Sequence, residues 1–320
     1  MNRVGIGHGQ KNYASSKFVF IAGWMLAAGA AAAQPTENVT VTGTRERQVL
    51  EKFVQGFAAP ARITGKLARW EDGVCPIVVG LKPQFTTFIA GRVKQVAATV
   101  GAPVNGNAGC RPNLQIVFTS APQALLDNVR QKQEPFLGYA DSREQRIALA
   151  TVKHPIQAWY TTATKDLRGN VQIDSARTAG KGMEITYACM PPQEGMCTLH
   201  LSNAHGASVT GNRLGDGLRT GFYHVIVVAE PAKLLDHEMG TLADYIAMVA
   251  LAQIPQPETC QPLPSIVNLL ARDCAPVTAL TGNDLAYLRG LYKMSPSLTL
   301  GVQESEIAYR MEQSLKEEKP

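Results

Sequence analysis

The sequence predicts one α+β domain with a mixed sheet, packed helices and a buried central helix. Two short apolar runs, Cys75–Leu81 and Asn113–Thr119, flank a stretch with helical periodicity, which is typical of a strand–helix–strand crossover. After about Lys132 the pattern changes to strand-like pieces separated by turns. A later stretch, Thr241–Gln253, is apolar nearly all round, so it predicts a helix inside the core.

The first 33 residues have the organisation of an export signal. Residues 1–17 carry three basic and no acidic side chains, the apolar run Phe18–Ala30 follows, and small residues then lead to Gln34-Pro35. We expect a signal peptide over residues 1–33, cleaved after about Ala33, and a periplasmic or secreted protein of a Gram-negative envelope. The alternative is an uncleaved anchor.

Charge after this cleavage argues against a nucleic-acid partner. Removing three basic residues from 31 leaves 28 Lys and Arg against 26 Asp and Glu, so the basic character largely belongs to the signal. No integral membrane segment is expected after signal removal, and no cofactor motif is present.

The stretch ENVTVTGTR, residues 37–45, has two interpretations. Valines and threonines alternate as in a short strand, which suits an ordinary N-terminus. The stretch also resembles the N-terminal segment of TonB-dependent outer-membrane receptors, which implies a strand added to a partner's sheet. The candidate docking strand comprises Val39, Thr40, Val41 and Thr42.

Helical and extended patterns alternate from Arg45 to Lys132. The segment 34–65 contains a short helix, Arg45–Phe57, and the main domain spans residues 66–300. Ser120 is expected to cap a helix with Pro122 in its first turn, running to about Lys132. The helix between the two strands has apolar residues at helical spacing: Phe85, Phe88, Ile89, Val93, Val96 and Val100.

Six cysteines in an exported chain predict three disulfides. Parallel strands of a crossover begin at the same end, which brings Cys75 to Cys110. A hairpin around residues 191–195 places Cys189 opposite Cys197. The remaining pair, Cys260 and Cys274, closes a Pro-rich loop.

Two further helices are expected near the C-terminus. Leu280–Tyr292 has Thr281 and Asp284 at capping-box spacing. Residues 301–320 form a polar helix that either docks or frays, with a narrow apolar stripe: Ile307, Met311 and Leu315.

The order of elements resembles the zincin metalloproteases, particularly the metzincin-like branch. It comprises a strand, a long helix, the NLQIVFT strand, a later strand, the buried helix, the LPSIVNLL turn and a helix ending in LRGLY. The resemblance implies that the buried helix stands where zincins carry HExxHxxG, whose positions here hold Ala243, Asp244, Ala247 and Ala250. Alanine cannot bind zinc, so the resemblance implies a zincin-like fold without metal chemistry.

We therefore expect a non-catalytic peptide- or protein-binding protein on a degenerate protease-like scaffold, with an exposed edge strand near Tyr223–Val228. The alternative is a metal-dependent hydrolase that uses histidines around His237, with Glu238. The Gly-rich, basic stretch Asn212–Gly221 favours a hairpin turn over an anion cradle. The histidines weighed for the hydrolase are His200, His205, His224 and His237.

Overall fold

The computed structural model describes residues 43–174, 183–188, 196–201, 215–255, 259–275 and 277–317. The chain divides into Met1–Thr40 and a compact unit, Val41–Pro320, which contains all of these residues. The helices of this unit in chain order are α1 (Gly43–Phe57), α2 (Pro83–Val100), α3 (Pro122–Gln133), η1 (Glu134–Leu137), α4 (Arg143–Leu149), η2 (Pro231–Lys233), α5 (Met239–Leu251), η3 (Ile266–Leu270), α6 (Gly282–Lys293) and α7 (Leu300–Glu317). The strands are β1 (Pro76–Val79), β2 (Leu114–Phe118), β3 (Ile156–Lys165), β4 (Val171–Ile173), β5 (Met183–Ala188), β6 (Met196–Leu201) and β7 (Arg219–Ala229).

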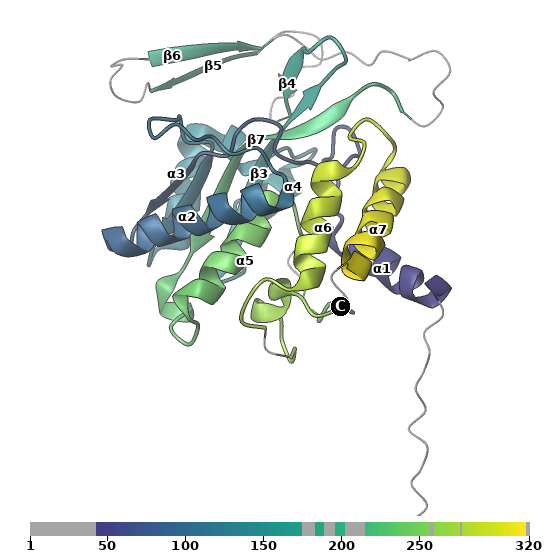
Figure 1. The fold of residues 1–320 in the computed structure, drawn as a ribbon. Coiled ribbons are helices and arrows are strands. Elements are labelled where there is room, and N and C mark those ends of the chain that lie inside the picture. Colours follow the sequence, from purple (N-terminus) through teal and green to yellow (C-terminus); the bar gives the residue numbers. More distant parts are fainter. Residues whose placement is uncertain are drawn as a thin grey trace, which may run out of the picture. The chain divides into compact units, whose positions relative to one another are not determined.

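A five-stranded mixed sheet in the order β1-β2-β7-β3-β4 forms the centre of the unit (Figure 1). Strands β1, β2 and β7 are parallel, whereas β3 runs antiparallel to β7 and forms a hairpin with β4. The expected α+β class and mixed sheet are confirmed. Strands β5 and β6 pair separately as an antiparallel ribbon, as the hairpin pattern predicted.

The expectation of an edge strand near Tyr223–Val228 is wrong. This run lies in β7, which pairs with β2 on one side and with β3 on the other. Its side chains are buried on both faces of the sheet, Val225 and Val227 in one core cluster, Ile226 and Val228 in the other. A strand covered on both faces needs apolar residues in succession rather than in alternation, which explains the run.

The crossover β1–α2–β2 forms as predicted. Helix α2 begins with Pro83 and ends at Val100, and the left-handed conformation of the next residue, Gly101 (φ 81°), lets its amide bond back to the last turn. Phe88 departs from the predicted apolar face, because it is 48% exposed, and Phe85 is only half-buried. Phe88 precedes Ile89 by one residue, and a helix turns about 100° per residue, so Phe88 points away from the buried stripe. That stripe is Ile89, Val93, Val96 and Val100.

Two of the expected disulfides are present. Cys75 pairs with Cys110 across the start of the parallel strands, with Cα atoms 6.1 Å apart, and Cys260 pairs with Cys274 at 5.5 Å. The third expected pair includes Cys189, which lies outside the described residues; on β6, the backbone of Cys197 is in register with Tyr187.

Helix ends follow local capping chemistry with one correction. Ala121, not Ser120, precedes the first residue of α3, and because alanine has no side-chain oxygen, no N-cap side chain accepts a hydrogen bond at this helix start. Pro122 lies in the first turn, as predicted. The capping box of α6 is confirmed, with Thr281 and Asp284 each accepting a hydrogen bond from the other's backbone amide.

Helices α1, α6 and α7 lie side by side next to the sheet (Figure 1). Phe53 and Phe57 of α1 contact the Tyr287 ring of α6, with centroids 6.5 and 5.0 Å apart. The C-terminal helix docks rather than frays, because Ile307 and Met311 are fully buried. Among the described residues, no helix is both long and apolar enough to cross a membrane.

The C-terminal end of α5 is held by three aromatic side chains from distant segments. The last carbonyls of a helix have no partner within it. Here the Trp70 indole N–H donates to Ala250 O (2.8 Å), and the Tyr292 hydroxyl donates to Leu251 O (2.8 Å). Tyr160 of β3 donates to the carbonyls of Val249 (2.7 Å) and Ala252 (3.2 Å).

Candidate functional site

The helix predicted to stand where zincins carry their motif is α5, and it is buried from Thr241 to Leu251. Ala243 and Ala247 are fully buried and bring no donor atom, and Ala250 offers only a backbone carbonyl, which already accepts from Trp70. Because the Ala243 and Ala247 side chains pack against other core residues, the motif positions on α5 offer neither metal ligands nor a cleft for a substrate.

Asp244, at the position of the motif's glutamate, links neighbouring segments through hydrogen bonds. Its carboxylate accepts a hydrogen bond from Arg92 Nε at 2.5 Å and another from Leu280 N at 3.0 Å. The hydrogen bond to Asp244 raises the pKa of Arg92. The pair therefore ties α2, α5 and the approach to α6 together, and the carboxylate is not free to act as a base.

Of the histidines weighed for metal binding, His224 and His237 have described surroundings and lie on different elements. His224 is buried on β7 beneath the Phe136 ring, with centroids 4.5 Å apart, and His237 lies in the loop before α5, where Glu238 is the N-cap residue. His200 falls on β6, whereas His205 lies outside the described residues. Within the described parts of the chain, no three His, Cys, Asp or Glu side chains are grouped to hold a metal ion.

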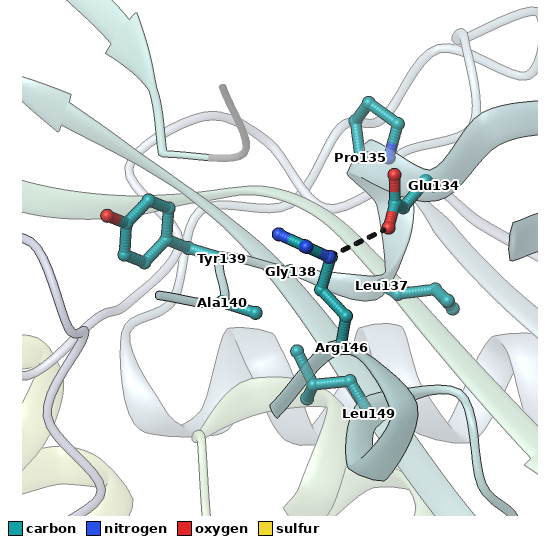
Figure 2. A pocket seen from close by; sticks show the side chains of 8 residues that line it. All are labelled: Glu134, Pro135, Leu137, Gly138, Tyr139, Ala140, Arg146 and Leu149. Carbon is teal, nitrogen blue, oxygen red and sulfur yellow. Dashed lines mark ion pairs between the residues drawn. The ribbon is translucent and has the colours of Figure 1, made fainter. Parts of the chain in front are cut away.

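A first candidate site, the edge pocket, has a volume of about 220 Å³ and is formed by η1, the loop after it and α4. Leu137, Ala140 and Leu149 give it apolar walls (Figure 2). The Arg146 side chain reaches toward Glu134, and their charged groups are 3.8 Å apart. Both side chains are more than one-third exposed, so this pair contributes little and leaves both charges available.

The edge pocket is joined to β3. Thr161 Oγ1 donates to Pro135 O at 3.1 Å, and the Trp159 indole N–H donates to Leu149 O at 2.5 Å. Gly138 is pressed against the strand with φ at 97°, and a Cβ on it would lie 2.7 Å from Tyr160 O. Only glycine fits this approach without strain.

At Ala158, next to this pocket, the outer edge of β3 has no paired strand among the described residues. Pro155 O accepts from Glu230 N on the β7 side, whereas Thr162 O accepts from Asp174 N on the outer side. Since backbone groups alternate along a strand, those of Ala158 and Tyr160 also point outward. Strand β4 pairs only with Ala163–Lys165, so in the described parts of the chain no strand pairs with the outward groups of Ala158.

A second candidate site, the arginine hollow, has a volume of about 580 Å³ and lies where β7 begins and β3 ends. Its charged lining is Arg69, Glu71, Asp72, Lys165 and Arg219. Glu71 Oε2 accepts a hydrogen bond from Arg219 Nε at 3.2 Å and lies 3.2 Å from Lys165 Nζ. Burial lowers the pKa of Arg69, and Arg219 adds to this effect while Glu71 opposes it.

Sequence reasoning missed both hollows. The edge pocket depends on the placement of Gly138, which no motif marks. The arginine hollow is lined by residues from five separate stretches of chain, which no sequence motif brings together. Of its charged residues, only Arg219 lies in a stretch that the sequence analysis considered for anion binding, residues 212–221.

The candidate docking strand, Val39–Thr42, lies outside the described residues. No protein-family model, no curated protein and no solved structure matches this chain.

Proposed function

We propose that this chain is a non-catalytic protein of the Gram-negative envelope that binds an extended peptide or protein segment in the periplasm. The observation that carries the proposal is the outward backbone of Ala158 on β3, with which no described strand pairs, near the edge pocket at Gly138. An extended peptide adds to such an edge through backbone hydrogen bonds, and a neighbouring pocket selects its side chains.

The scaffold supports this proposal in two ways. The order of strand, long helix, strand, later strand and buried helix is the one on which the resemblance to degenerate zincins rests. The two disulfides fit an exported protein, which supports a partner in an oxidising compartment.

The chemistry of the edge pocket defines what it selects. Its apolar walls suit an aliphatic or aromatic side chain, and the exposed charges of Arg146 and Glu134 suit a polar group at the tip of that side chain. The backbone contacts supply affinity that does not depend on sequence.

The test is a peptide array probed with the purified full chain, followed by fluorescence anisotropy on the peptides that bind. The Ala158→Pro variant removes an outward amide without removing a bond to β7, so it is expected to weaken binding at least about tenfold. Ala158→Ser keeps the amide and is the matched control. Absence of segment-specific binding, or equal binding by both variants, would overturn the proposal.

A metal-dependent hydrolase around His237 is the alternative, and no described contact of His237 favours it. Elemental analysis of protein purified without chelator separates the two functions. Stoichiometric zinc that is lost on replacing His237 by alanine would favour the hydrolase.

A further inference from the structure

The arginine hollow contains cationic donors that the fold does not use. Arg69 makes its three hydrogen bonds with one nitrogen, Nη1, which donates to the carbonyls of Leu291 (3.1 Å), Tyr292 (2.9 Å) and Met294 (2.9 Å). Arg69 Nε and Nη2 have no hydrogen bond to a described residue, and Arg69 lines the hollow.

Arg219 also has N–H donors without a hydrogen bond to a described residue. Its Nε bonds to Glu71, whereas neither Nη1 nor Nη2 bonds to any residue that the structure describes. The side chain is 34% exposed and lines the same hollow. Two arginines with unused N–H donors therefore line one hollow, and a guanidinium matches the geometry of a carboxylate or phosphate.

The balance of charge in the hollow favours an anion. Three cations, Arg69, Lys165 and Arg219, face two carboxylates, and the side chain of Asp72 is 75% exposed at the rim. Glu71, 14% exposed, is the inner carboxylate and holds Lys165 and Arg219 in place. The carbonyls at the C-terminal end of α6 carry partial negative charge, which would repel an anion. Arg69 Nη1 donates to these carbonyls and so compensates for that charge.

We infer that the arginine hollow binds the oxyanion of a small ligand, a carboxylate or a phosphate, between Arg69 and Arg219. Its volume of about 580 Å³ suits a molecule larger than the anion alone. This site is separate from the edge pocket and from the proposed peptide edge, so either proposal can fail without the other.

The experiment is isothermal titration of the full disulfide-bonded chain with inorganic phosphate and, separately, with succinate, at constant ionic strength. Saturable binding at one site per chain is expected for one of them, and which one binds identifies phosphate or carboxylate as the ligand chemistry. Arg219→Gln is expected to weaken this binding about tenfold, because it removes a bidentate donor.

Glu71→Gln is expected to act in the opposite direction. It removes the inner carboxylate that competes with the ligand, so binding is expected to tighten severalfold. Arg130→Gln makes the same charge change as Arg219→Gln on α3, where its side chain is 45% exposed, and is expected to bind like the parent chain.

Three results would overturn the inference. The first is no saturable binding of either anion by the parent chain and by Glu71→Gln. The second is equal weakening by Arg219→Gln and Arg130→Gln, which would indicate general charge screening. The third is weaker rather than tighter binding by a folded Glu71→Gln variant, as judged by circular dichroism.

Discussion

Acid is expected to destabilise this fold through one buried histidine, His224. Burial, followed by the positive charge of Arg111, lowers the pKa of His224 to about 4. Its Nδ1 is buried and finds no hydrogen-bond acceptor among the described residues. The folded state therefore favours the neutral ring, whereas the unfolded chain takes up a proton near the ordinary value of about 6.5.

The sign and size of the effect follow from this difference. The folded-state pKa is the lower one, so the contribution is fully present above about pH 6.5 and is lost as the pH falls toward about 4. The difference of about 2.5 pKa units corresponds to about 3 kcal/mol below pH 4, about 2.5 kcal/mol at pH 4.5 and about 1.4 kcal/mol at pH 5.5.

The perturbation is His224→Leu, which cannot be protonated. Urea unfolding of the parent chain and the variant is followed by far-UV circular dichroism from about pH 7.5 to about pH 4.5. The free energy of unfolding of the variant is expected to fall less, by about 2.5 kcal/mol at the lowest pH. Burial raises the pKa of Asp174 and Asp284, which gives stability on acidification, but this contribution is common to both proteins and cancels.

His237→Gln is the control, since this histidine lies partly exposed in the loop before α5. This replacement leaves His224 and its contact with the Phe136 ring in place, so it separates the loss of the buried imidazole from the loss of a histidine in general. Parallel pH profiles for the parent chain and His224→Leu would refute the reasoning, because they would mean that the imidazole is solvated or paired in the folded state.

Four further outcomes are expected. Tyr160→Phe removes the hydroxyl at the end of α5, so the free energy of unfolding in urea should fall by about 1–3 kcal/mol; an unchanged value would mean that water replaces it. Gly138→Ala places a Cβ against β3 at positive φ and should lower stability by about 1–3 kcal/mol in the same assay, whereas an unchanged melting temperature would argue against the close approach. Replacing Cys260 and Cys274 together by serine should lower the free energy of unfolding by about 3 kcal/mol, and a change within error would show that η3 holds the loop alone. Mass spectrometric elemental analysis should find zinc well below one atom per chain, and one atom per chain would return attention to His237.

Local patterns predicted much of this fold. The crossover β1–α2–β2, the Cys75–Cys110 disulfide and the capping box at Thr281 each depend on residues close in sequence or on the handedness of a single unit. The buried character of α5 followed from its composition alone. Such features need no knowledge of how distant segments meet.

Features that depend on distant contacts were missed or misplaced. The apolar run of β7 predicts burial, but its central position depends on β3 pairing along its other side. The role of Asp244 could not be read from its place in α5, because its partner Arg92 lies on α2. Both candidate hollows arise where several segments converge, and a single sequence does not encode that convergence as a motif.

The aromatic contacts at the end of α5 also bear on how the chain folds. Trp70, Tyr160 and Tyr292 come from the segment before β1, from β3 and from α6, and each satisfies a carbonyl of the same helix terminus. In a partly folded chain that lacks any one of these elements, a carbonyl at the end of α5 has no hydrogen-bond donor while it remains surrounded by apolar side chains. The unit is therefore expected to unfold in one cooperative step, with the amides of α5 exchanging their hydrogens only on global opening, and truncation before α6 is expected to leave no stable fragment.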